Sequence, residues 1–170
     1  RVVAFYHAQF ADRRSRGWQY LESRGLADDQ LIARFSIGYA PQGPAGLMKT
    51  IPDCQRKAGR EIRAELTEAG WSREVPTKRG GQEFTASREL LSNCITLPII
   101  GADGAVLECY GRKTITRKDC GPVHFYLPGS HRGVWNADEC IGPDGSVILC
   151  EAAFDALTFY RHGFRNVTWS

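Results

Sequence analysis

The last thirty or so residues carry the pattern that most constrains the fold. An apolar run, "SVILC" (146–150), ends at Glu151, and "DALTFYRHG" (155–163) then has helical character up to a glycine. A second strand is expected to begin at Asn166. A strand, a helix and a second strand in this order are typical of a right-handed crossover between parallel strands. The pattern therefore predicts one β-α-β unit at this end of the chain.

The first half of the chain is predicted to be mainly helical. In residues 2–35 the apolar side chains recur at helical spacing, and Gly17 and Gly25 interrupt them, which indicates two or three short helices. The segment 56–70 is amphipathic at the same spacing and ends at a glycine, so it predicts one surface helix. A brief strand is expected at "FSIGYAP" (35–41) between these helical segments.

The middle of the chain changes to a strand pattern. Residues 71–88 are polar and contain glycine, which fits a loop or an exposed hairpin. The runs "CITLPII" (94–100) and "AVLECYGRK" (105–113) flank the turn "GADG", so they predict an antiparallel hairpin, and "VHFYLPGS" (123–130) adds a short strand. The predicted class is therefore α+β, with N-terminal helices and a small antiparallel sheet over 1–140, followed by the β-α-β unit of a second domain over 141–170.

Two carboxylates stand where the strand of the β-α-β unit meets its helix. Glu151 follows the strand, and Asp155 is four residues later, on the same side of the first helical turn. Ligands collect at the carboxyl ends of strands in α/β sheets, and two carboxylates there can share a divalent metal ion. A structural alternative is that Asp155 caps the helix and Glu151 favours its positive end. The spacing alone leaves both interpretations open.

Cations and aromatic rings alternate in two segments, "YGRKTITRK" (110–118) and "SHRGVW" (130–135). Single-stranded nucleic acid is bound in this way, with cations for the phosphates and rings for the bases. The alternative is that lysine and arginine simply protect exposed strand edges from aggregation. The candidate phosphate-binding residues are Arg112, Lys113, Arg117, Lys118, His131 and Arg132, with Tyr110 and Trp135 as the accompanying rings.

Composition excludes some alternatives. The formal net charge of +3 permits a polyanionic partner without requiring one. None of the six cysteines has CxxC or CxxH spacing, so no zinc is expected, and Cys94, Cys109 and Cys150 are interpreted as reduced, buried thiols. No apolar run is long enough to span a bilayer, and no signal peptide is visible. A cytoplasmic protein without a membrane partner is the expectation.

Three of these segments resemble the catalytic core of bacterial-type DNA primases. "YLESRGLADDQLIARFSIGYAP" (20–41) is similar to the beginning of that core, and "LPIIGADGAVLECYGRK" (97–113) to its proline-isoleucine strand, hairpin and glycine-arginine ending. "VILCEAAFDALTFYRHGFRNVT" (147–168) resembles the opening of the toprim domain that primases share with topoisomerases. The resemblance implies a primase N-terminal subdomain over 1–140 and the beginning of a toprim domain over 141–170.

The resemblance also implies a function. It is the synthesis of short RNA primers on single-stranded DNA from nucleoside triphosphates, by metal-dependent phosphoryl transfer. Glu151 would be the catalytic residue and would hold Mg²⁺ or Mn²⁺ with Asp155, while Arg112 and Lys113 would contact template or nucleotide phosphate. A replicative helicase would be a partner through regions outside this chain. The alternatives are a toprim nuclease of a mobile element or defence system, and a non-catalytic nucleic-acid-binding module.

Several departures from the family pattern bear on activity. Ala152 replaces the glycine that usually follows the glutamate, and it would be strained if this position needed a positive φ. The family's usual lysine falls near Phe125, and its later Asp-x-Asp motif is not found in these 170 residues. We therefore expect the chain to be part of a longer protein and to be inactive by itself.

Overall fold

Three short helices open the chain. The computed structural model describes residues 1–115 and 121–170, and it contains α1 (Val2–Ala8), the 3-10 turn η1 (Gln9–Ala11), α2 (Arg16–Ser23) and α3 (Asp29–Arg34). Side chains fix where two of them begin, because Ser15 accepts from the Trp18 amide and Asp28 accepts from the Leu31 amide. The predicted number of helices is confirmed. Within the described residues, no helix has the length and apolar character that crossing a bilayer would require.

A four-stranded antiparallel sheet forms the centre of the molecule. Its order is β1 (Gly38–Ala40), β4 (Cys94–Ile100), β5 (Val106–Lys113) and β6 (His124–Tyr126). The predicted hairpin is confirmed, since β4 and β5 pair antiparallel with Leu97 opposite Tyr110. A register shift between Ile99 and Ile100, next to the turn, was not predicted.

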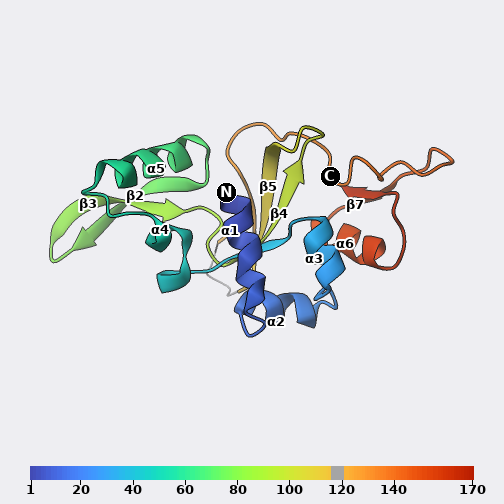
Figure 1. Ribbon diagram of the computed structural model, residues 1–170, viewed down its shortest axis with the longest axis horizontal. Helices are drawn as coiled ribbons and strands as arrows, with labels where there is room; N and C mark the ends of the chain where they lie inside the picture. The colour runs from blue at the N-terminus through green and yellow to red at the C-terminus, as the bar shows by residue number, and fades with distance from the viewer. Residues whose placement is uncertain (116–120) are drawn as a thin grey trace.

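A separate lobe lies between β1 and β4 in sequence. It contains η2 (Gly43–Ala45), α4 (Leu47–Thr50), α5 (Lys57–Glu68) and the hairpin β2 (Ser72–Arg79) with β3 (Gln82–Glu89). The amphipathic helix is confirmed, and residues 71–88 form the hairpin rather than a loop. Figure 1 shows this lobe at one end of the elongated molecule, with the central sheet and α1 in the middle.

The C-terminal segment lies at the other end of the molecule (Figure 1) and forms the predicted crossover. It consists of β7 (Ile148–Cys150), α6 (Ala153–Arg161) and β8 (Val167–Trp169). The two strands pair in parallel, with Cys150 opposite Trp169. The domain boundary at residue 140 stays a prediction.

Two hydrophobic cores lie on opposite faces of the central sheet. Successive side chains of a strand point to opposite faces, and in β5 Tyr110 enters one core while Cys109 enters the other. The Tyr110 core also contains residues of α2, α3, α6 and β8, so it joins the C-terminal unit to the first helices. The Cys109 core contains Tyr6 of α1 and Trp71 beside the β2-β3 hairpin. As predicted, Cys94, Cys109 and Cys150 are buried free thiols.

Candidate metal and phosphate site

The two predicted metal ligands lie at the junction of β7 and α6. Glu151 directly follows β7, Asp155 lies in the first turn of α6, and both are exposed. The residue that caps this helix is Ala152, and no side chain makes a capping hydrogen bond. The structural alternative for Asp155, that it caps the helix, is therefore not what the structure shows.

Ala152 does not strain the turn between strand and helix. Its backbone has φ −136° and ψ 143°, which is an extended conformation that any residue adopts. The possible penalty for an alanine at a positive φ therefore does not arise. The replacement of the usual glycine is compatible with the position of Glu151 at the strand end.

The carboxylates of Glu151 and Asp155 are free to bind a cation. In the part of the chain that the structure describes, neither has a lysine, arginine or histidine nitrogen within 4 Å. The pKa of the Cys150 thiol, at the end of β7, is raised by burial and by the negative charge of Asp155. Mg²⁺ typically takes one or two protein carboxylates and completes its coordination with water and phosphate oxygens. This donor set fits such an ion.

No larger metal-binding cluster accompanies the two carboxylates. Across residues 1–115 and 121–170, no group of three or more histidine, cysteine, aspartate or glutamate side chains is placed to hold a metal ion. A site of two exposed carboxylates depends on substrate oxygens or on further protein ligands to fix the ion.

Arg112 lies on the face of the sheet that is turned toward the C-terminal unit. Its Nε donates to the Tyr20 hydroxyl group at 3.3 Å. The ring of Tyr20 packs edge-on against Phe154 of α6, with the centroids 5.7 Å apart. Because Phe154 precedes Asp155 by one residue, this chain of contacts connects Arg112 to the helix that begins beside Glu151.

His124 is a further residue of this site that was not predicted from the sequence. Its Nε2 contacts a guanidinium nitrogen of Arg112, and its Nδ1 shares a hydrogen bond of 2.8 Å with the Tyr110 hydroxyl group. Partial burial and the positive charge of Arg112 lower the pKa of the His124 imidazole. The available signal was its position on the short strand predicted to follow β5.

Lys113 is not brought together with Arg112, although the two are adjacent in sequence. Neighbouring residues of a strand point to opposite faces. The ammonium group of Lys113 donates to the Ser92 carbonyl oxygen and lies 5.0 Å from the centroid of the Phe125 ring. Arg112 and Lys113, the two predicted phosphate-binding residues, therefore lie on different faces of the sheet.

The remaining predicted cations do not lie beside Arg112 in the described residues. His131 contacts the buried carboxylate of Glu108 at 3.1 Å, near the beginning of β5. Glu108 is four positions from Arg112 along β5, which corresponds to about 13 Å. Arg132 is exposed beside His131. Arg117 and Lys118 lie outside the described residues.

The two rings that accompany the cations in the sequence are not available for base stacking. Tyr110 is 2% exposed and Trp135 is 3% exposed. Both pack against Trp169 of β8, with ring centroids 6.1 and 4.7 Å away. The interpretation of these two residues as a stacking surface is therefore wrong, because contacts with the distant C-terminal strand bury them.

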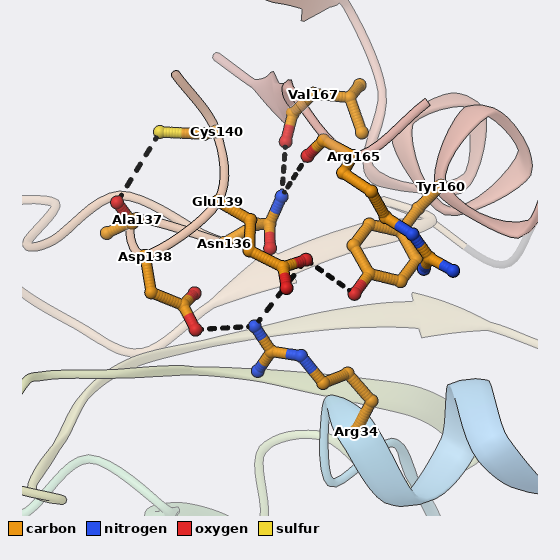
Figure 2. A network of polar contacts seen from close by, with 9 residues as sticks. All are labelled: Arg34, Asn136, Ala137, Asp138, Glu139, Cys140, Tyr160, Arg165 and Val167. Carbon is orange, nitrogen blue, oxygen red and sulfur yellow. Dashed lines mark hydrogen bonds and ion pairs between the residues drawn. The ribbon is translucent and has the colours of Figure 1, made fainter. Parts of the chain in front are cut away.

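The loop before β7 fixes the C-terminal unit against the first helices (Figure 2). Asp138 accepts from Arg34 of α3 at 2.6 Å. Glu139 accepts from the Tyr160 hydroxyl group at 2.7 Å, and Asn136 donates to the Arg165 and Val167 carbonyl oxygens at 2.7 and 3.0 Å. The contacts of this loop span α3, α6 and β8, so it sets the orientation in which Glu151 is presented. None of these loop side chains was predicted to belong to the site.

Curated proteins that are similar to most of this chain are DNA primases. No family model matches it. A curated DNA primase of Aquifex aeolicus is 29% identical over 176 residues, which cover 98% of this chain and 32% of that protein. A DNA primase of Legionella pneumophila is 28% identical over 157 residues, which cover 87% of this chain and 24% of that protein. The chain thus spans about a third or less of the length of these relatives.

Solved structures match the fold. The catalytic core of the E. coli primase superposes with a TM-score of 0.71 and 23% identity, covering 99% of this chain and 52% of that one. The DnaG primase catalytic domain bound to single-stranded DNA gives 0.73 and 23%, with 99% and 52% covered. The fold is therefore that of a bacterial primase catalytic core. Sequence and fold together relate this chain to the bacterial-type DNA primases, and it corresponds to about half of their catalytic core.

Proposed function

We propose that this chain takes part in the template-directed synthesis of RNA primers on single-stranded DNA from nucleoside triphosphates. The position of Glu151 at the end of β7, beside Asp155 and without a competing cation in the described residues, is the observation that carries the proposal. The similarity to DNA primases over 98% of the chain supports it.

Each residue of the site has a role in this proposal. Glu151 and Asp155 would hold Mg²⁺ or Mn²⁺, which stabilises the charge that develops on the phosphates during phosphoryl transfer. Arg112 would contact a phosphate of the template or of the incoming nucleotide, since it lies on the side of the sheet that faces α6. Tyr20 and His124 would hold the guanidinium group in place. Phosphoryl transfer requires mainly such positioning and charge stabilisation from a protein.

The proposal has a direct test. A protein that contains this sequence within the length of the curated relatives should make short RNA primers on single-stranded DNA with Mg²⁺, and Glu151→Gln should abolish them. DNA binding by the variant should stay within about twofold, because phosphate contacts rather than carboxylates provide the affinity. Nicked DNA in place of primers would contradict the proposal and indicate a nuclease.

The 170-residue chain alone gives a second test. We expect weak binding of single-stranded DNA, with dissociation constants in the micromolar range or above that rise steeply with salt, as in non-specific phosphate contacts. We expect no primer synthesis with Mg²⁺ or Mn²⁺, because two carboxylates leave the metal geometry incomplete. Primers made by this chain and lost on Glu151→Gln would refute the second expectation.

A further inference from the structure

The two faces of the β2-β3 hairpin carry different charges. Every carboxylate of the two strands lies on one face, which contains Glu74, Glu83 and Glu89. Arg73 and Arg88 lie on the other face and are directly opposite each other in the strand register. The hairpin therefore has one face with carboxylates and one with a pair of guanidinium groups.

The arginine pair has no carboxylate partner in the described residues. Neither Arg73 nor Arg88 has an aspartate or glutamate oxygen within 4 Å, and both are exposed. On the other face, by contrast, Lys78 pairs with Glu83 at 2.7 Å. Like charges directly opposite each other destabilise a strand pair. An arrangement that sacrifices stability in this way is suited to an anion held between the two groups.

An aromatic ring completes the arginine face. Phe84 lies on the same face as Arg88 and is 45% exposed. It is four residues from Arg88 along β3, or about 13 Å. The half-buried side chains of Val75 and Ala86 lie on the same face, between the arginine pair and Phe84. Cations beside an exposed ring are what a surface needs to hold phosphates and to stack a base.

We propose that the face formed by Arg73, Arg88 and Phe84, the hairpin surface, binds single-stranded nucleic acid. The arginines contact phosphates and Phe84 stacks on an unpaired base, which favours a single strand because a duplex hides the faces of its bases. The hairpin surface lies at the opposite end of the molecule from β7 and α6 (Figure 1), so it is separate from the Glu151 site. This inference rests on the proposed function, since it adds a second contact for the same polymer.

The arginine pair can be tested in the 170-residue chain by fluorescence anisotropy with a labelled oligothymidine at several salt concentrations. R73Q/R88Q should lower the affinity at 0.1 M salt about tenfold or more and reduce the salt slope by about 1.4, which is the effect of two lost phosphate contacts. K57Q/K78Q is the matched control. It removes the same charge from the same lobe, but from lysines that pair with Glu61 and Glu83. It should change the affinity less than about threefold.

The ring is tested separately. F84A should weaken oligothymidine binding about fivefold or more, and F84W should bind like the unmodified chain because it restores the stacking face. Circular dichroism melts would verify that each variant is folded. Equal losses in R73Q/R88Q and K57Q/K78Q, or an F84A variant with unchanged affinity, would overturn the inference. If the unmodified chain shows no salt-sensitive binding, the hairpin surface is refuted, whereas the proposed function is decided separately by primer synthesis in the longer protein.

Discussion

Arg112 donates a hydrogen bond to the Tyr20 hydroxyl group at 3.3 Å, across 92 positions of the sequence. Strand alternation places the guanidinium group on the sheet face that is turned toward α6, where this contact orients it, whereas Lys113 points to the other face and donates to the Ser92 carbonyl oxygen. Arg112 and Lys113 are adjacent in sequence, but only Arg112 contacts Tyr20 on the face that is turned toward α6.

Arg112→Gln should therefore weaken binding of single-stranded DNA by about fivefold, and Lys113→Gln by clearly less. Tyr20→Phe keeps the ring against Phe154 and removes only the hydrogen bond, so an intermediate loss is expected if Tyr20 positions the guanidinium group. Anisotropy titrations of the three variants at one salt concentration provide the measurement. Equal effects of the Arg112 and Lys113 variants would argue against separate roles.

Glu151 should contribute little to stability. Its side chain is exposed and has no basic partner within 4 Å in the described residues, so Glu151→Gln should change the free energy of unfolding by less than about 0.5 kcal/mol. Asp155→Asn removes a negative charge from the first turn of α6 and should cost about 0.3 to 1 kcal/mol. Urea denaturation measures both. A large loss with Glu151→Gln would indicate a structural role.

Asn136 should be among the most sensitive residues of the loop before β7. It has φ 59°, and its side-chain amide donates to two carbonyl oxygens of the β8 region. Asn136→Ala loses both hydrogen bonds and adds left-handed backbone strain, which together cost about 2 to 4 kcal/mol. Asn136→Gly keeps the backbone conformation and should be less damaging by about 1 kcal/mol. Equal unfolding free energies for the two variants would show that the strain is unimportant.

Glu89 should make stability depend on pH. Burial raises the pKa of this carboxyl group above its ordinary value of 4.5, against the opposing effects of the Tyr6 hydroxyl group, the Leu47 amide and Lys113. The folded state then binds this proton more tightly than the unfolded state. Its contribution to stability is largest below pH 4.5 and is lost as the pH rises through the folded-state value.

Glu89→Gln should therefore flatten the decline of unfolding free energy above pH 4.5, measured by urea denaturation between pH 4 and 7. Glu74→Gln is the matched control, since it changes an exposed carboxylate on the same hairpin face and leaves Glu89 in place. A pH profile of the Glu89 variant that follows the unmodified chain would contradict the assignment.

Local pattern predicted most of the secondary structure but only part of the site. The crossover that carries Glu151 and the β4-β5 hairpin follow from short-range periodicity and turn residues, so both were predictable. The separation of Arg112 from Lys113 also follows from strand alternation, and it was therefore predictable although the two were predicted to act together. The burial of Trp135 depends on Phe35 and Trp169, which are far away in sequence. The buried carboxylate of Glu108 likewise depends on later residues, since it accepts from the Leu127 amide.

The central sheet lies between the two cores, and this arrangement affects amide hydrogen exchange. The side chains of β4 and β5 alternate between the two cores, so exposing the amides of these strands requires both sides of the sheet to open. The β2-β3 hairpin and the β7-β8 pair each border one core and can open while the other stays closed. Exchange should therefore be slowest in β4 and β5 and faster at both ends of the molecule. The hairpin surface and the Glu151 site, at the two ends, would then move independently about a rigid centre that contains Arg112.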